Sequence, residues 1–115
     1  MDKKKFPKNF IFGTAVASYQ VEGGIYNNDW TIWENNKNSK CEELCGEACK
    51  HYELVNEDIK LLKNLGIRAF RFSIEWSRIQ PEKNKYDQEA IQHYVCLLYT
   101  SDAADEGLAV DLGGR

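Results

Sequence analysis

The sequence has no long apolar run and no strong excess of charge of one sign. No segment approaches the roughly 18 apolar residues that a transmembrane helix needs, and residues 1–7 are not followed by the apolar stretch of a signal peptide. The net charge of -3, from 15 basic and 18 acidic residues, produces no field that favours nucleic acid or an anionic membrane. We therefore expect a cytoplasmic protein with no nucleic-acid and no membrane partner.

Closely spaced cysteine pairs of the kind found in zinc sites are also missing. Cys41, Cys45 and Cys49 are spaced four residues apart and would share a face if this stretch were helical. With His51 as a further ligand, they leave open a small cysteine-based metal or redox module. Without a C-x-x-C pair, and in a reducing compartment, free cysteines are favoured, so we expect no metal site. Metal analysis of the purified protein would separate the two hypotheses.

The length of 115 residues allows one domain at most. With 43% hydrophobic and 29% charged residues, the composition is that of an ordinary globular protein. A complete (β/α)8 barrel typically takes about 250 residues. A barrel could therefore only be present in this chain as a part.

The hydrophobic pattern predicts a strand, a long loop and a helix in the first half of the chain. Residues 9–17 form an apolar, β-leaning run that ends in small side chains. Residues 23–40 are polar and rich in turn-forming residues, which predicts a loop. Apolar side chains recur at helical spacing over residues 52–65, and Gly66 follows where a left-handed C-cap is expected.

A second strand and a second helix follow. Residues 67–74 alternate, which places Phe70, Phe72 and Ile74 on one face and Arg71 on the other. Asp87 is a good N-cap for a helix that begins directly after it. The order of strand, helix, strand and helix predicts an α/β fold with a parallel sheet.

From about Cys96 the character of the sequence changes. The amphipathic pattern stops, and residues 107–115 supply neither a strand nor a capped helix. We therefore divide the chain into residues 1–95, which carry the α/β pattern, and a tail of residues 96–115 of artefactual or non-native origin. A divergent natural C-terminus is the alternative.

Two segments identify the family. The run from Phe10 to Gly23, which reads FIFGTAVASYQVEG, resembles the N-terminal signature of glycosyl hydrolase family one, the β-glucosidase family. The run from Arg71 to Ile79, RFSIEWSRI, preceded by His51-Tyr52 and Leu65-Gly66-Ile67, is similar to the second βα unit of the same family. The resemblance covers residues 6–95 and implies the N-terminal part of a (β/α)8 TIM barrel, incomplete in this chain, with the tail unrelated to the family.

The resemblance also implies roles for individual residues. Gln20 matches the glutamine that hydrogen-bonds two hydroxyls of the non-reducing sugar, and an amide offers the donor and the acceptor for this. Arg71 matches the arginine that holds the nucleophilic glutamate ionised and oriented. Trp33, in the long loop, is expected to line the leaving-group side of the cleft, with packing as the alternative.

The catalytic residues themselves are expected downstream of this sequence. Retaining glycosidases need a carboxylic acid and a carboxylate about 5 Å apart. In the family these are glutamates in an Asn-Glu-Pro and a Glu-Asn-Gly motif, and neither motif occurs here. Glu22 and Glu75 match family positions that are not catalytic. We therefore expect the chain alone to be inactive.

For the parent enzyme, the resemblance implies retaining hydrolysis of a β-glucoside or related sugar through a covalent glycosyl-enzyme, with no cofactor. A 6-phospho-β-glycosidase of the same family is the alternative within the class, because its phosphate-binding loop would also lie downstream. The preferred sugar, the leaving group and the oligomeric state do not follow from this sequence.

Overall fold

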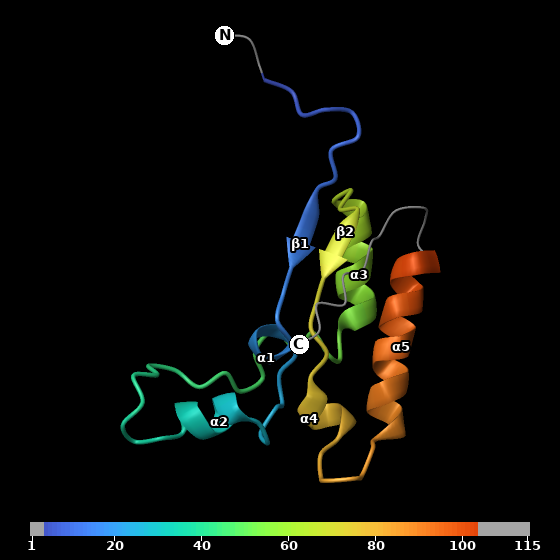
Figure 1. The fold of residues 1–115 in the computed structure, drawn as a ribbon. Coiled ribbons are helices and arrows are strands. Elements are labelled where there is room, and N and C mark those ends of the chain that lie inside the picture. The colour runs from blue at the N-terminus through green and yellow to red at the C-terminus, as the bar shows by residue number, and fades with distance from the viewer. Residues whose placement is uncertain (1–3, 104–115) are drawn as a thin grey trace.

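The computed structural model describes residues 4–103, which form a short parallel sheet covered on one face by two helices (Figure 1). The strands are β1 (Gly13–Ala15) and β2 (Ala69–Arg71). The longer helices are α3 (Val55–Asn64) and α5 (Gln88–Ala103), and the shorter ones are α1 (Ser18–Val21), α2 (Asp29–Glu34) and α4 (Trp76–Ile79). The predicted alternation of strands and helices is confirmed, and the predicted long loop contains the additional helix α2.

The two strands pair in parallel, with Gly13 opposite Ala69 and Ala15 opposite Arg71. A Cβ atom at Gly13 would lie 3.0 Å from both the Cβ and the carbonyl oxygen of Ala69, so glycine permits this close approach. Both strands are shorter than the sequence predicts, because the two segments pair as a ladder over only three residues each. Hydrogen bonds from Arg68 N to Phe12 O and from Val16 N to Arg71 O extend the pairing at each end.

Helix α3 ends as the sequence predicts. Gly66 adopts a left-handed conformation with φ of 72°, and the amide of Ile67 donates to the carbonyl of Leu62. The turn sends the chain directly into β2. Asp87 caps α5, because its Oδ1 accepts from the amides of Glu89 and Ala90 at 2.9 and 3.0 Å.

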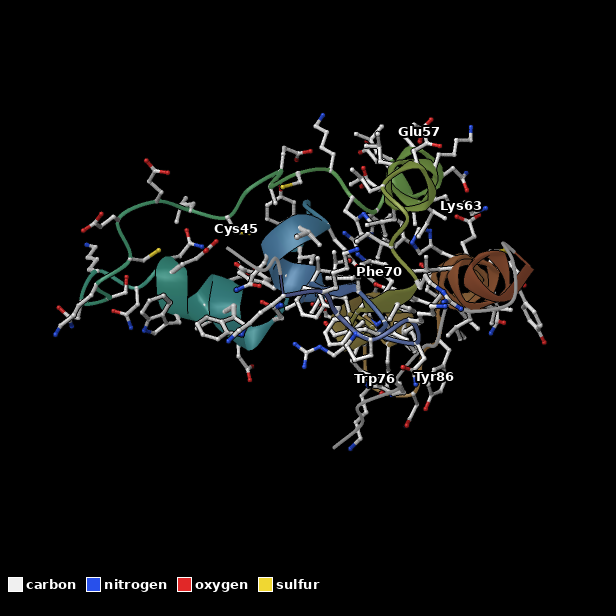
Figure 2. All side chains as sticks on the ribbon, turned by 90° about the horizontal axis from the view of Figure 1, so that it is seen from above. Cys45, Glu57, Lys63, Phe70, Trp76 and Tyr86 are labelled. Carbon is white, nitrogen blue, oxygen red and sulfur yellow. The ribbon has the colours of Figure 1, made fainter. Side chains whose placement is uncertain are left out.

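The core lies between the sheet and the helices α3 and α5. Figure 2 shows Phe70 there, whereas Glu57 and Lys63 project from α3 and Trp76 and Tyr86 lie at the periphery. The prediction that Phe70, Phe72 and Ile74 share one face holds for Phe70 and Phe72, which are both buried, whereas Ile74 is 38% exposed. The buried hydrophobic cluster consists of Ile59, Phe70, Phe72, Ile79, Ala90, Tyr94 and Leu97.

Residues 41–49 form turns rather than a helix. Gly46 and Ala48 adopt positive φ angles of 54° and 44°, which an α-helix cannot accommodate, so the cysteines do not share a helical face. Instead, the thiol of Cys45 donates to the carbonyl of Tyr19 at 2.8 Å. Within residues 4–103, no three His, Cys, Asp or Glu side chains are placed to hold a metal ion.

The predicted tail begins inside helix α5. This helix continues past Val95 to Ala103, and Leu97 is 4% exposed in the core. Residues 104–115 lie outside the described residues, and they include residues 107–115, which the sequence predicts to be neither strand nor capped helix. Over residues 4–103, no helix combines the length and the apolar character needed to cross a bilayer.

Candidate functional site

The carboxyl ends of β1 and β2 lie at the same edge of the sheet, because the strands are parallel. Helix α1 follows β1 at this edge (Figure 1) and carries Gln20, whose side chain is exposed. Residues 73–77 follow β2 at the same edge. In parallel α/β folds, ligands bind at this edge. The structure therefore places Gln20 where a ligand site is expected.

Arg71 is the last residue of β2, and Phe70 beside it is buried under the helices. Since neighbouring side chains of a strand point to opposite faces, the guanidinium lies on the face that α3 and α5 do not cover. Arg71 is exposed, and among residues 4–99, whose side chains the structure describes, no carboxylate forms an ion pair with it. It is thus available to a carboxylate outside the described residues.

Trp33 lies on α2, which Asn28 caps by accepting from the amide of Thr31 at 3.0 Å. It is 46% exposed and packs edge-on against Trp30, with ring centroids 5.7 Å apart. Trp30 in turn stacks on Tyr19 at 6.3 Å. The three rings form an aromatic surface beside the turn that carries Gln20.

A pocket of about 530 Å³ opens between the segments that follow the two strands. Its walls combine exposed aromatic rings with amide, hydroxyl and carboxylate groups, which is a surface chemistry suited to sugars. Gln20, Trp33 and Arg71 are not among its lining residues, so the structure does not bring these three together in one pocket. The lining residues are Ala17, Ser18, Tyr19, Asn27, Asn28, Asp29, Trp30, Ser73, Glu75, Trp76, Ser77 and Gln80.

A buried polar network is centred on Glu22, which is 5% exposed, and it reaches the pocket through Glu75. Glu22 Oε2 accepts from Arg78 Nε at 2.9 Å, and Glu22 Oε1 accepts from the hydroxyl of Tyr94 at 2.7 Å. Arg78 also donates to the carbonyl of Gly23, and its guanidinium lies 3.9 Å above the ring of Tyr52. The buried carboxylate is therefore both paired and hydrogen-bonded.

Glu75, 8% exposed, is the second carboxylate of this network. Its Oε1 accepts from the hydroxyl of Ser77 at 2.8 Å, and its Oε2 accepts from the hydroxyl of Ser18 at 3.2 Å. The backbone amide of Glu75 donates to the hydroxyl of Tyr94 at 3.2 Å. Glu75 is among the lining residues, but neither Glu22 nor Glu75 presents a free carboxylate to the pocket, because both are already hydrogen-bonded.

Burial dominates the electrostatics of this network. It raises the pKa of Glu22, although hydrogen bonds from Tyr94 and Arg78 oppose the rise. Burial and the neighbouring Glu22 carboxylate raise the pKa of Tyr94 well above its usual range. Tyr94 therefore stays protonated and keeps its hydroxyl as a donor toward Glu22.

The sequence did not point to Arg78 and Tyr94 as partners of Glu22. Tyr94 lies on the same helical face as Ala90 and Leu97, so its spacing predicts a core residue. Its ring is indeed buried. The only signal of a polar role is a charged Arg78 next to the buried Ile79. Such a charge requires a partner, but the spacing does not say which one.

Comparison with known proteins identifies the family of this chain. The profile of glycosyl hydrolase family 1 matches residues 2–106. Beta-glucosidase A of Acetivibrio thermocellus is 41% identical over 102 residues, which cover 82% of this chain and 22% of that protein. Beta-glucosidase A of Thermotoga maritima is 39% identical over 101 residues, 82% of this chain and 23% of that protein.

Solved structures of beta-glycosidases resemble this chain in fold as well as in sequence. The beta-glycosidase from Pyrococcus horikoshii superposes with a TM-score of 0.81 at 40% identity, over 94% of this chain and 25% of that one. The chain thus spans about a quarter of the length of the proteins it matches, and β1 and β2 with their helices form the N-terminal part of a (β/α)8 barrel. On the family profile and on these relatives, the chain belongs to glycosyl hydrolase family 1.

Proposed function

We propose that the complete protein hydrolyses β-glycosidic bonds of a β-glucoside or a related sugar, with retention of configuration and without a cofactor. The observation that carries this proposal is the position of Gln20, on the helix after β1, and of Arg71, at the end of β2, at the same edge of the sheet of a family 1 chain. The relatives named beta-glucosidase support it. A cytoplasmic location is part of the same proposal.

In this proposal Gln20 binds the sugar and Arg71 supports the nucleophile. The exposed amide of Gln20 donates to one sugar hydroxyl and accepts from another. The unpaired guanidinium of Arg71 lies next to a glutamate supplied by another part of the barrel, lowers its pKa and orients it for attack. Trp33 belongs to the aromatic surface on the leaving-group side.

The acid and the nucleophile are two glutamates outside this sequence. Glu22 and Glu75 do not fit either role, because their carboxylates are buried and already hydrogen-bonded within the network. A covalent mechanism needs a carboxylate free to reach the anomeric carbon and a second one, about 5 Å away, that can donate a proton to the leaving oxygen.

We also propose that residues 1–95 are the family segment and that residues 96–115 have a separate origin. The lack of a strand or capped-helix pattern in the sequence of residues 107–115 supports this proposal. Because Leu97 is buried in the core, a native continuation should also place an apolar residue at this position of α5. The genomic DNA after the Val95 codon tests the boundary: it should encode a third strand and an Asn-Glu-Pro segment.

A hybrid enzyme tests the proposed function. Residues 4–95 of this chain replace the matching segment of Thermotoga maritima beta-glucosidase A, whose own sequence continues helix α5 and supplies the rest of the barrel. We expect the hybrid to hydrolyse 4-nitrophenyl β-glucoside and to release β-glucose first, which nuclear magnetic resonance detects. The matched control is the same hybrid carrying Gln20→Ala.

A folded hybrid without turnover of any β-glycoside would contradict the proposed function. Release of α-glucose as the first product would contradict the retaining mechanism. Equal kcat/KM for the hybrid and its Gln20→Ala variant would remove Gln20 from the sugar site while leaving the activity itself intact.

A further inference from the structure

One hydroxyl group connects the two segments that form the candidate site. The Tyr94 hydroxyl donates to Glu22 Oε1 at 2.7 Å, on the segment after β1. The same oxygen accepts from the amide of Glu75 at 3.2 Å, on the segment after β2. Tyr94 is 2% exposed, so no water competes for these bonds. A residue of α5 thus fixes the distance between two site segments.

The position of Gln20 depends on this connection, because the four-residue helix that carries Gln20 is too short to be stable without outside contacts. Helix α1 has four residues, and its C-cap is Glu22, whose amide donates to the carbonyl of Ser18 at 2.9 Å. At its start, the amide of Ser18 donates to the hydroxyl of Ser73 at 2.8 Å. At its end, the carboxylate of Glu22 is held by Arg78 and Tyr94. The position of Gln20 between these two anchors is therefore set from outside the turn.

The two partners of Glu22 do different things. Arg78 supplies the positive charge that keeps a buried carboxylate tolerable, and it is itself held by the Gly23 carbonyl and by the ring of Tyr52. Tyr94 brings no charge. Its hydroxyl fixes the direction of the second carboxylate oxygen, so removing it should shift the turn without leaving an unpaired charge.

We propose that Tyr94 is a positioning residue for sugar recognition, acting through Glu22 to place the amide of Gln20 at the non-reducing sugar. The proposal rests on the proposed function, because it needs Gln20 to contact sugar hydroxyls. Tyr94 touches neither substrate nor the reacting atoms. Its effect should therefore appear only where the contacts of Gln20 matter.

The experiment measures Tyr94→Phe in the hybrid enzyme, with Tyr86→Phe as the matched control. Phenylalanine keeps the buried ring and removes only the hydroxyl. Tyr86 is 55% exposed and precedes the same helix, so its loss of a hydroxyl should leave kcat/KM unchanged. Tyr94→Phe should lower kcat/KM for 4-nitrophenyl β-glucoside by about tenfold, since small displacements of positioning groups have large kinetic effects.

The decisive readout is the dependence on substrate hydroxyls. A series of monodeoxy β-glucosides first shows which hydroxyls Gln20 contacts, because Gln20→Ala loses its effect on those substrates. Tyr94→Phe should lose its effect on the same substrates and on no others. In the Gln20→Ala background, Tyr94→Phe should then change kcat/KM by less than about twofold.

A merely structural role predicts a different pattern. Equal losses from Tyr94→Phe on every deoxy substrate, or full additivity with Gln20→Ala, would overturn the proposal. Glu22→Gln is the second variant and must show the same substrate pattern, including in the case that Tyr94→Phe does not fold. A hybrid that is inactive before any substitution fails at the proposed function instead, so the two failures are distinguishable.

Discussion

Gly23→Ala is the substitution whose effect the structure defines most sharply. Gly23 has φ of 79°, and a Cβ atom there would lie 2.1 Å from the carbonyl oxygen of Glu47 and 2.7 Å from its carbonyl carbon. Real Cβ atoms essentially never approach within 3.0 Å. Both atoms of Glu47 belong to the backbone, so no side chain can rotate away, and one of the two segments must move.

Two costs add at this position. A left-handed conformation costs alanine about 1–2 kcal/mol, and forcing extra volume into a packed site typically costs about 1–3 kcal/mol. We therefore expect Gly23→Ala to destabilise the hybrid enzyme by roughly 2–5 kcal/mol. Because Gly23 follows Glu22 and its carbonyl accepts from Arg78, the same shift should lower kcat/KM.

Gly24→Ala is the matched control. Gly24 has φ of 66°, but a Cβ atom there meets nothing within 4 Å, so only the conformational cost remains. The assay is thermal unfolding of both variants followed by circular dichroism, with kcat/KM measured in parallel. If Gly23→Ala lowers the unfolding temperature no more than Gly24→Ala does, the contact with Glu47 is not rigid and the reasoning fails.

The remaining predictions concern the site and the chain itself. A polypeptide of residues 1–115 alone should not turn over a chromogenic β-glucoside, because it lacks both glutamate motifs, and turnover above a catalytically dead control would refute this. The same polypeptide should not unfold in one sharp thermal transition, because its two strands have open edges. In the hybrid, Gln20→Ala should lower both kcat and substrate affinity, at a cost of about 2–4 kcal/mol in transition-state binding. Arg71→Ala should instead raise the pKa of the nucleophile and move the acidic limb of the pH–rate profile upward; an unmoved limb would make Arg71 structural. Burial, followed by repulsion from Arg78 and His51, lowers the pKa of His93 below 6.5, so its contribution to stability is present above that pH and lost as the pH falls through the folded-state pKa. His93→Gln should reduce the loss of thermal stability between pH 7.5 and pH 5, and an unchanged slope would exclude His93 as its source.

Local features were the part of the fold that sequence reasoning predicted well. The end of α3 at Gly66, the cap at Asp87 and the common buried face of Phe70 and Phe72 each depend on residues within a few positions of one another. Backbone conformation and side-chain alternation determine such features, and both can be read from the chain.

Helix α2 was missed because its pattern is short. Its N-cap Asn28 and the first-turn Asp29 are typical helix-start residues, but in a segment rich in turn residues they read equally well as a loop. The suggestion that Cys41, Cys45 and Cys49 share a helical face is wrong, because these residues do not form a helix. Spacing alone supported it, while Gly46, between Cys45 and Cys49, already favoured a turn.

The polar network could not be predicted because its members are far apart in the sequence. Glu22 and Tyr94 are separated by 72 positions, and neither residue carries a local sign of the other. The assignments of Gln20, Trp33 and Arg71 came from the family resemblance rather than from periodicity. They remain predictions, since the groups they would contact belong to the sugar or to other parts of the barrel.

The parallel pairing of β1 and β2 also determines when this part of the protein can fold. Ser18 and Ser73, bonded just beyond the two strands, are 55 positions apart, and closing a loop of that length costs about 3.5 kcal/mol of chain entropy plus a constant. Three residue pairs alone do not offset this cost, so β1 must wait for the core around Phe70. At a synthesis rate of about 5–20 residues per second, β2 leaves the ribosome roughly 3–11 seconds after β1. During that interval β1 lacks its partner strand and is preceded by the apolar Phe10, Ile11 and Phe12, so we expect a chaperone to bind the nascent chain, or aggregation to begin, at this segment.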